Sequence, residues 1–116
     1  MVEAVLADLV EEDRLDYVFH ALANRTRRAL LRDLARGPAR VTELARPYRI
    51  SVNAISKHLL VLERSGLIRR ARSGAVQTCV LDAAPMASAD EWIDDYRRFW
   101  DGKLSQLAEF VEAAKD

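Results

Sequence analysis

Cysteine and glycine are scarce in this chain, which has one cysteine, Cys79, and four glycines. One cysteine cannot form an internal disulfide and supplies no Cys-x-x-Cys pair, so a secreted disulfide scaffold and a cysteine-rich zinc module are excluded. The sequence also has no Gly-x-Gly-x-x-Gly loop and no histidine or cysteine cluster that would build a catalytic or metal site. We therefore expect neither an enzyme nor a bound cofactor.

Long hydrophobic runs are absent as well. No segment approaches the roughly 18 apolar residues of a membrane span, and the acidic start of the chain, residues 1–16, is unlike a signal peptide. The composition of 50% hydrophobic and 31% charged residues is that of a folded globular protein. From 116 residues we expect one domain, residues 1–116, in the cytoplasm and without a membrane partner.

The formal net charge is zero, but the charge is unevenly distributed along the chain. Residues 1–24 carry one arginine against six acids (−5), residues 25–73 carry thirteen cations against three acids (+10), and residues 74–116 carry four against nine (−5). A basic block of this size indicates a polyanion partner, because clustered cations attract phosphates and release counterions. The alternative is a solvated basic face that pairs with the acidic ends.

Apolar residues three and four positions apart predict a series of helices in the first part of the chain. The first covers residues 13–23, with Leu15, Val18, Phe19 and Leu22 in its stripe. Asn24 is a good N-cap for a second helix, which ends at a Gly-Pro pair. A third, over residues 42–48, must be short because Pro47 would break a longer one.

The fourth helix is expected over residues 52–65, between the N-cap Ser51 and the terminator Gly66. One face is apolar and is assigned to the core by Ile55, Leu59 and Leu62. The opposite face points to solvent and carries hydrogen-bonding groups at its start and a cation at its end: Asn53, Lys57, Leu60 and Arg64, with Ser56 on the flank.

A basic hairpin and a long helix complete the predicted order. Residues 67–73 and 75–81 flank Ser73-Gly74 and predict a two-stranded hairpin. Ser88 and Glu91 form a capping-box pattern that opens a helix reaching about Ala114. That helix carries a wide apolar stripe made of Trp92, Ile93, Tyr96, Phe99, Trp100, Leu104, Leu107, Phe110 and Val111.

A short helix, a tight turn, a capped second helix and a basic hairpin are typical of a winged helix-turn-helix, a mainly α fold of about five helices. The second helix of that pair enters the major groove, where Asn53 suits adenine, Lys57 suits guanine and Ser56 suits either a base or a phosphate. Phosphate contacts are expected from eight arginines: Arg25, Arg27, Arg28, Arg46, Arg49, Arg69, Arg70 and Arg72.

The segments "ALANRTRRALLRDLARGP", "VTELARPYRISVNAISKHLLVLERSGLIRRARSG" and "YRRFWDGKL" closely resemble the ArsR-type repressors of the ArsR/SmtB superfamily. The resemblance implies a homodimeric bacterial transcriptional repressor that binds a two-fold symmetric operator. It implies that Val52, Asn53, Ser56 and Lys57 contact DNA bases. It also places the dimer interface on the first and last helices, at Leu15, Phe19, Trp92, Tyr96, Phe99, Trp100, Leu104 and Leu107.

Metal sensing by the sites known in that family is not expected. The third helix reads "VTELARPY" without cysteine, and the last helix has no histidine. His20, His58 and Cys79 are scattered and lack ligand spacing, so a structural role is expected for each. Two alternatives stay open: a winged helix that contacts only other proteins, and a repressor that responds to a ligand or to redox change through an unrecognised site, with Cys79 as the redox candidate.

Overall fold

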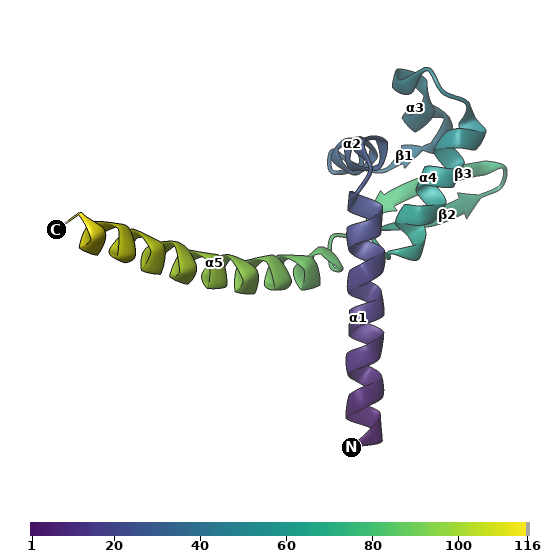
Figure 1. Ribbon diagram of the computed structural model, residues 1–116. Coiled ribbons are helices and arrows are strands. Elements are labelled where there is room, and N and C mark those ends of the chain that lie inside the picture. Colours follow the sequence, from purple (N-terminus) through teal and green to yellow (C-terminus); the bar gives the residue numbers. More distant parts are fainter. Residues whose placement is uncertain (116) are drawn as a thin grey trace. The chain divides into compact units, whose positions relative to one another are not determined.

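A computed structural model describes residues 1–115, with the side chains of residues 7 and 8 left out. It contains two compact units, Met1–Met86 and Ala87–Asp116. The first unit holds, in chain order, α1 (Val2–Leu22), α2 (Arg25–Leu34), β1 (Ala39–Arg40), α3 (Val41–Ala45), the 3-10 turn η1 (Arg46–Tyr48), α4 (Val52–Arg64), β2 (Ile68–Ser73) and β3 (Val76–Leu81). Figure 1 labels the helices and strands. Almost all of α5 (Met86–Ala114) forms the second unit.

Helix α1 is longer than the sequence pattern predicted, since it begins at Val2 and not near residue 13. Its second half is packed: Val18 and Ala21 are buried, and the helix contacts α2 and α4. In its first half Val5, Leu6 and Leu9 are each more than half exposed. The extra turns were missed because their apolar residues are interleaved with acids and do not belong to the core of this unit.

The predicted start of α2 is confirmed. Asn24 has an extended backbone, and its side-chain oxygen accepts a hydrogen bond from the backbone N–H of Arg27 at 3.1 Å. This satisfies one of the amide groups that the first turn of a helix leaves unpaired. Leu30 and Leu34 then face the core and are at most 2% exposed.

The third helix is brief, as Pro47 required. Helix α3 ends at Ala45 and the chain continues as the 3-10 turn η1. Arg49 follows with a φ of 54°, a left-handed conformation that tightens the turn into α4. The Tyr48 hydroxyl donates to the Asp33 carboxylate at 2.8 Å and so joins this turn to α2. Burial and the neighbouring Asp33 carboxylate raise the pKa of Tyr48 to about 12, so the phenol stays protonated.

Helix α4 begins and ends where the sequence predicted, within one residue. The Ser51 side chain accepts from the Ala54 amide at 3.1 Å, and Gly66 beyond the C-terminus has a φ of 80°. The three residues of the apolar face, Ile55, Leu59 and Leu62, are 0% exposed. Gly66 also approaches Pro85 so closely that an added Cβ would lie 3.2 Å from the proline Cγ.

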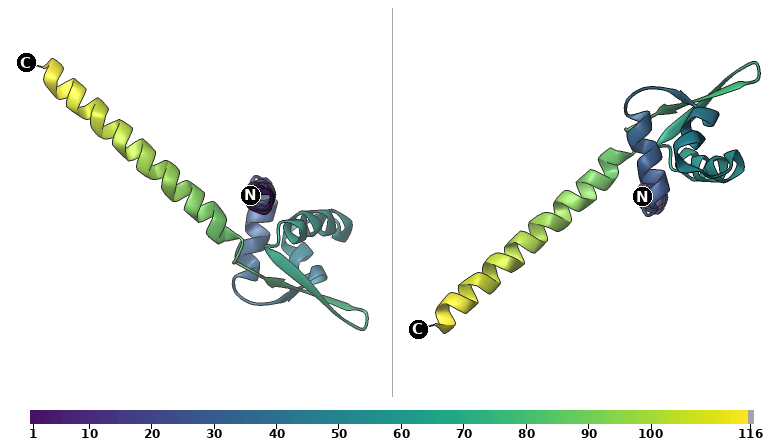
Figure 2. Two further views of the ribbon diagram at one scale, coloured as in Figure 1. Left: turned by 90° about the horizontal axis from the view of Figure 1, so that it is seen from below. Right: turned by 90° about the horizontal axis from the view of Figure 1, so that it is seen from above.

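The sheet has three strands in the described part of the chain, where the sequence predicted only a two-stranded hairpin. Strands β2 and β3 pair from Ile68 opposite Leu81 to Ser73 opposite Val76, which confirms the hairpin. The additional strand, β1, pairs with β3 through Ala39 and Arg40, giving the order β1-β3-β2. Both views of Figure 2 show the hairpin tip projecting away from the helices of this unit.

Helix α5 begins at Met86, so the predicted capping box is wrong: Ser88 lies inside the first turn and is not the N-cap. The Asp82 carboxylate instead accepts the Ala84 amide at 3.1 Å in the preceding turn. The predicted end near Ala114 is confirmed. No helix among the described residues is both long and apolar enough to cross a membrane.

Candidate nucleic-acid interface

The first turns of α4 present the four residues predicted to contact bases. Val52 is 47% exposed, Asn53 and Lys57 are exposed, and Ser56 is half-buried. The buried face of the same helix fixes their direction, because Ile55 and Leu59 anchor the helix in the core. The result is a rigid helix whose exposed start carries an amide, a hydroxyl and an ammonium group. These groups match the donors and acceptors of base edges in a major groove.

A groove of about 440 Å³ adjoins this helix start and extends to the hairpin. Val52 and Ser56 line it from α4, and Ala75, Val76 and Gln77 line it from the hairpin. The remaining wall is formed by Arg40 at the end of β1 and by Val41 and Thr42 at the start of α3. Sequence reasoning missed Arg40, Thr42 and Gln77 as interface residues. Arg40 belongs to the basic block, but its position depends on the β1–β3 pairing.

Six of the eight arginines predicted to contact phosphates are exposed, and these are Arg25, Arg28, Arg46, Arg49, Arg69 and Arg72. Two of them also make contacts within the chain. Arg28 donates to the Leu22 carbonyl at 2.8 Å, and Arg69 lies 3.8 Å from the Asp82 carboxylate with 73% of its side chain exposed. Such an exposed ion pair contributes little and leaves the guanidinium available to another anion.

Arg27 is placed differently, since it is only 8% exposed. Its Nε donates to the Ala21 carbonyl at 2.9 Å and its Nη2 to the His20 carbonyl at 2.8 Å. These carbonyls belong to the last turn of α1, where helical partners run out. Burial lowers the pKa of Arg27. The guanidinium therefore joins α1 to α2 and is not exposed to a DNA phosphate.

His58 follows Lys57 on α4 and is half-buried, with its Nδ1 3.4 Å from Nη1 of Arg27. Burial, and then the positive charge of Arg27, lower the pKa of His58, so the neutral ring is favoured. His20 is exposed on α1. Among the described residues no group of three metal-ligating side chains gathers in one place.

Cys79 lies in the central strand β3 and is 0% exposed. Burial is the main effect that raises the pKa of its thiol. A buried thiol with a raised pKa has little of the reactive thiolate form. This environment is typical of a structural cysteine.

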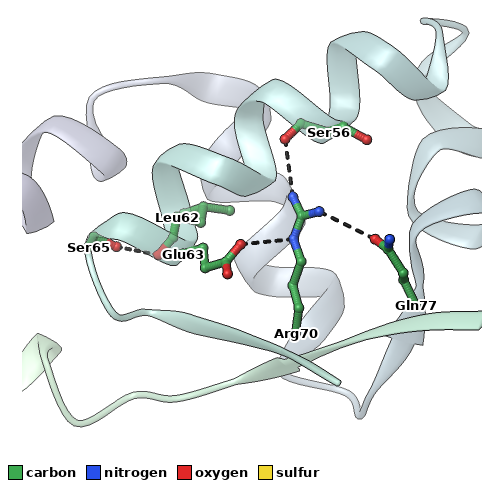
Figure 3. Close-up of polar contacts among 6 residues, drawn as sticks. All are labelled: Ser56, Leu62, Glu63, Ser65, Arg70 and Gln77. Carbon is green, nitrogen blue, oxygen red and sulfur yellow. Dashed lines mark hydrogen bonds and ion pairs between the residues drawn. The ribbon is translucent and has the colours of Figure 1, made fainter. Parts of the chain in front are cut away.

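Arg70 also differs from its neighbours in the hairpin, because its side chain is only 24% exposed. Its Nε lies 3.0 Å from the Glu63 carboxylate in an ion pair that lacks hydrogen-bond geometry. Its Nη2 donates to the Ser56 carbonyl at 3.2 Å and its Nη1 to the Gln77 side chain at 3.4 Å. Figure 3 shows the guanidinium between α4 and β3, with contacts to both.

The residues predicted for a dimer interface fall into two groups. Six lie on α5 and are exposed: Trp92, Tyr96, Phe99, Trp100, Leu104 and Leu107. The other two, Leu15 and Phe19 on α1, are half-buried within the first unit. The aromatic rings of α5 contact one another, with 5.1 Å between the ring centroids of Trp92 and Tyr96. Sequence reasoning did not single out the exposed Val5, Leu6 and Leu9 of α1, although their three- and four-residue spacing was a usable signal.

Comparison with known proteins agrees with this geometry. A family model described as a helix-turn-helix domain matches residues 22–71. The HTH-type transcriptional regulator Rv2034 of Mycobacterium tuberculosis is 36% identical over 101 residues, which are 87% of this chain and 92% of that protein.

Solved structures give the same result. A crystal structure of an ArsR family transcriptional regulator matches with a TM-score of 0.73 and 39% identity, covering 78% of this chain and 93% of the other. An ArsR-like regulator from Rhodococcus sp. RHA1 matches with a TM-score of 0.69 and 26% identity, covering 85% and 93%. A homodimeric winged helix-turn-helix DNA-binding domain from Mycobacterium bovis, solved by NMR, matches with a TM-score of 0.61 and 25% identity, covering 80% and 86%.

The fold and the exposed start of α4 define a winged helix-turn-helix protein of the DNA-binding type. The relatives are transcriptional regulators and not enzymes. This chain belongs to the ArsR family of transcriptional regulators, which confirms the resemblance found in its sequence.

Proposed function

We propose that this regulator is a homodimeric repressor that binds a two-fold symmetric operator in double-stranded DNA. The observation that carries the proposal is the juxtaposition on one surface of the exposed start of α4, the groove beside it and the arginine-bearing hairpin. One class of macromolecule matches a rigid polar helix flanked by cations, namely duplex DNA with its base edges and phosphates.

Base reading is assigned to the start of α4. Asn53 and Lys57 are exposed with polar ends free to enter a groove, and Val52 offers an apolar contact for a thymine methyl. Ser56 lies at the groove between the helix and the hairpin, where a base or a phosphate is within reach of a hydroxyl. Phosphate contacts are assigned to the six exposed arginines, because the buried Arg27 and the half-buried Arg70 already have protein partners.

Dimerisation is assigned to α1 and α5. One α4 reads only a few base pairs, whereas two copies related by a two-fold axis read two half-sites about one helical turn apart. The apolar residues of α5 are too many and too exposed for a monomer, since Phe99, Leu104 and Leu107 are each more than half exposed. The related domain from Mycobacterium bovis is described as homodimeric. We propose that the whole chain acts as one DNA-binding domain with dimerisation helices at both ends, in the cytoplasm.

The proposed repressor is not a metal sensor of the cysteine or histidine types known in its family. The described residues hold no cluster of metal ligands, and Cys79 is buried in the sheet. The choice of repressor over activator rests on the family resemblance.

Selection of bound sequences from a random duplex pool tests the central claim. We expect enrichment of a site with two-fold symmetry, and binding that weakens steeply as salt rises because phosphate contacts release counterions. Lys57→Ala should lose sequence preference, and Arg72→Ala should lower the affinity for all sequences alike. A reporter gene with the enriched site over its promoter should then be silenced by the protein.

The matched control is Arg36→Ala, which removes an exposed arginine of the basic block that has no assigned DNA contact. It should leave binding nearly unchanged. A duplex pool from which no two-fold symmetric site is enriched would contradict the proposal. Binding that stays flat across salt concentrations would favour a winged helix that contacts only proteins.

A further inference from the structure

The Arg70 side chain lies in the hairpin, where a phosphate contact was expected, yet its guanidinium already contacts three groups of the protein. A guanidinium has five N–H donors in a rigid fork. On Arg70 three directions of that fork are used, toward the Glu63 carboxylate, the Ser56 carbonyl and the Gln77 amide. Only about a quarter of the side chain is exposed, against 73% for Arg69 on the same strand.

The contacts of Arg70 connect three elements. Ser56 and Glu63 are seven residues apart, two turns of α4, and so lie on one face of that helix. Gln77 belongs to β3, where it pairs with Arg72 and lies diagonal to Arg70 across the hairpin. One side chain on β2 therefore contacts two successive points along α4 and the neighbouring strand, as Figure 3 shows.

The position of Arg70 along the hairpin adds to this connection. At the root of the hairpin the chain is already fixed, because the Ser65 hydroxyl donates to the Leu62 carbonyl at 2.6 Å and the Leu67 amide donates to the same carbonyl at 3.1 Å. Arg70 provides a second attachment further toward the tip, at the level of Ser56. Strand β1 also holds β3 at this level, through Cys79 and Thr78, and Arg70, opposite Cys79, adds the attachment of this part of the hairpin to α4.

We propose that Arg70 is a positioning residue that sets the orientation of the hairpin relative to the base-reading start of α4, and is not a phosphate contact. The cluster of Arg70, Glu63, Gln77 and the Ser56 carbonyl is termed the wing brace. The wing brace fixes the width of the groove between α4 and the hairpin, since Ser56 and Gln77 line that groove. The inference rests on the proposed function, because the groove is part of the proposed DNA interface.

Glu63 offers the sharpest test, since the two roles of Arg70 predict opposite signs. If Arg70 binds phosphate, Glu63→Ala removes a negative charge near DNA, frees Arg70 and tightens binding. If Arg70 braces the hairpin, Glu63→Ala loosens it and weakens binding. We expect Glu63→Ala and Arg70→Ala each to lower affinity for the selected operator about tenfold. The double variant should be no weaker than Arg70→Ala alone, because Glu63 acts on the hairpin only through Arg70.

Lysine variants separate charge from geometry and protect the test against misfolding. Arg70→Lys keeps the charge but cannot make three directed contacts, so we expect it to lose affinity nearly as much as Arg70→Ala. Arg72→Lys, on the exposed neighbour, should retain affinity. The melting temperature of Arg70→Lys should match that of the wild-type protein, which distinguishes a misoriented hairpin from an unfolded protein.

Hydrogen exchange of the free protein provides a readout that needs no DNA. Amides of the hairpin should exchange faster in Glu63→Ala and Arg70→Lys than in the unchanged protein and in Arg72→Lys. Tighter DNA binding by Glu63→Ala, additive effects in the double variant, or unchanged hairpin exchange would each overturn the proposal. Arg72→Ala reports on the proposed function instead: it should reduce the slope of log affinity against log salt by about 0.9 for each protomer bound, and an unchanged slope would count against the DNA interface itself.

Discussion

Helices α4 and α5 carry the same kind of amphipathic pattern, but the structure treats their apolar faces in opposite ways. On α4 the apolar face is closed off within the first unit, and Ile55, Leu59 and Leu62 are 0% exposed. On α5 the corresponding face is open, with Leu104 and Leu107 55% and 58% exposed. An amphipathic pattern indicates that the apolar face of a helix is buried, but it does not indicate whether the same chain or a second chain buries it. The comparison separates residues that hold the fold from residues available to a second copy.

The largest expected effect is on the buried face of α4. Leu59→Ala removes buried methyl groups and leaves a cavity, so the free energy of unfolding should fall by about 2–5 kcal/mol. Leu60→Ala, on the exposed face of the same helix, should change it by less than about 0.5 kcal/mol. Denaturant titration at two protein concentrations measures both. Similar losses for the two variants would mean that the faces of α4 are assigned wrongly.

On α5, a charge placed in the aromatic stripe should dissociate the dimer but leave the first unit folded. Trp100→Glu places a carboxylate in an apolar interface and should raise the dimer dissociation constant by about a hundredfold or more. Sedimentation across a concentration series measures this, and circular dichroism should show the helices of the first unit retained. Asp101→Asn is the neighbouring control. A Trp100→Glu protein that remains dimeric would remove α5 from the interface.

The packed first unit also contains a strained backbone residue, in the turn that leads into α4. Arg49 has a left-handed φ of 54°, which costs a residue with a Cβ about 1 kcal/mol. Arg49→Gly should therefore raise the free energy of unfolding by about 1 kcal/mol while lowering affinity for DNA, since it removes a proposed phosphate contact. Arg46→Gly, at a right-handed position, should lose both stability and affinity. Chemical denaturation and DNA titration give the two readouts.

The smallest expected effect is a pH dependence that belongs to α4 and is absent from α5, which has no histidine. The pKa of His58 is lowered from its ordinary value of 6.5, so near that pH the folded protein binds fewer protons than the unfolded chain. Stability should be complete above pH 6.5, fall as the pH drops below it, and reach its full loss below the lowered pKa. Melting temperatures between about pH 5.5 and 7.5 measure this. His58→Gln should flatten the curve, and an unchanged curve would place the effect on another group.

Much of the fold could be predicted from the sequence because its signals act over short distances. Asn24 and Ser51 each accept a hydrogen bond from an amide three residues away, and Pro47, which has no N–H, lies in the 3-10 turn directly after α3. The errors arose where a distant partner decides the outcome. Strand β1 exists only because Ala39 lies opposite Cys79. The capping box at Ser88 matched the motif, but the turn held by Asp82 started the helix earlier.

The candidate site shows the same division. The exposed face of α4 could be predicted from the angular spacing of its residues, and Asn53 and Lys57 lie on that face. Which arginines would contact protein groups could not be predicted. In the sequence Arg27 and Arg70 resemble the other arginines of the basic block, yet their side chains contact carbonyls and a carboxylate on other elements. The partners of a long side chain are set by residues that come close together only in the folded protein.

The two-residue strand β1 has a consequence for how this chain tolerates insertions and deletions. Its pairing sets Arg40 opposite Thr78, and Val41 begins α3 at the very next residue. One residue added or removed within Ala39–Arg40 would exchange the two faces of the strand and shift the start of α3 with it. The hairpin tip at Gly74 has no third strand paired to it and opens onto free space, although its φ of 62° favours glycine at that position itself. We expect length variation among related sequences to collect at the tip and to be excluded from the segment before α3.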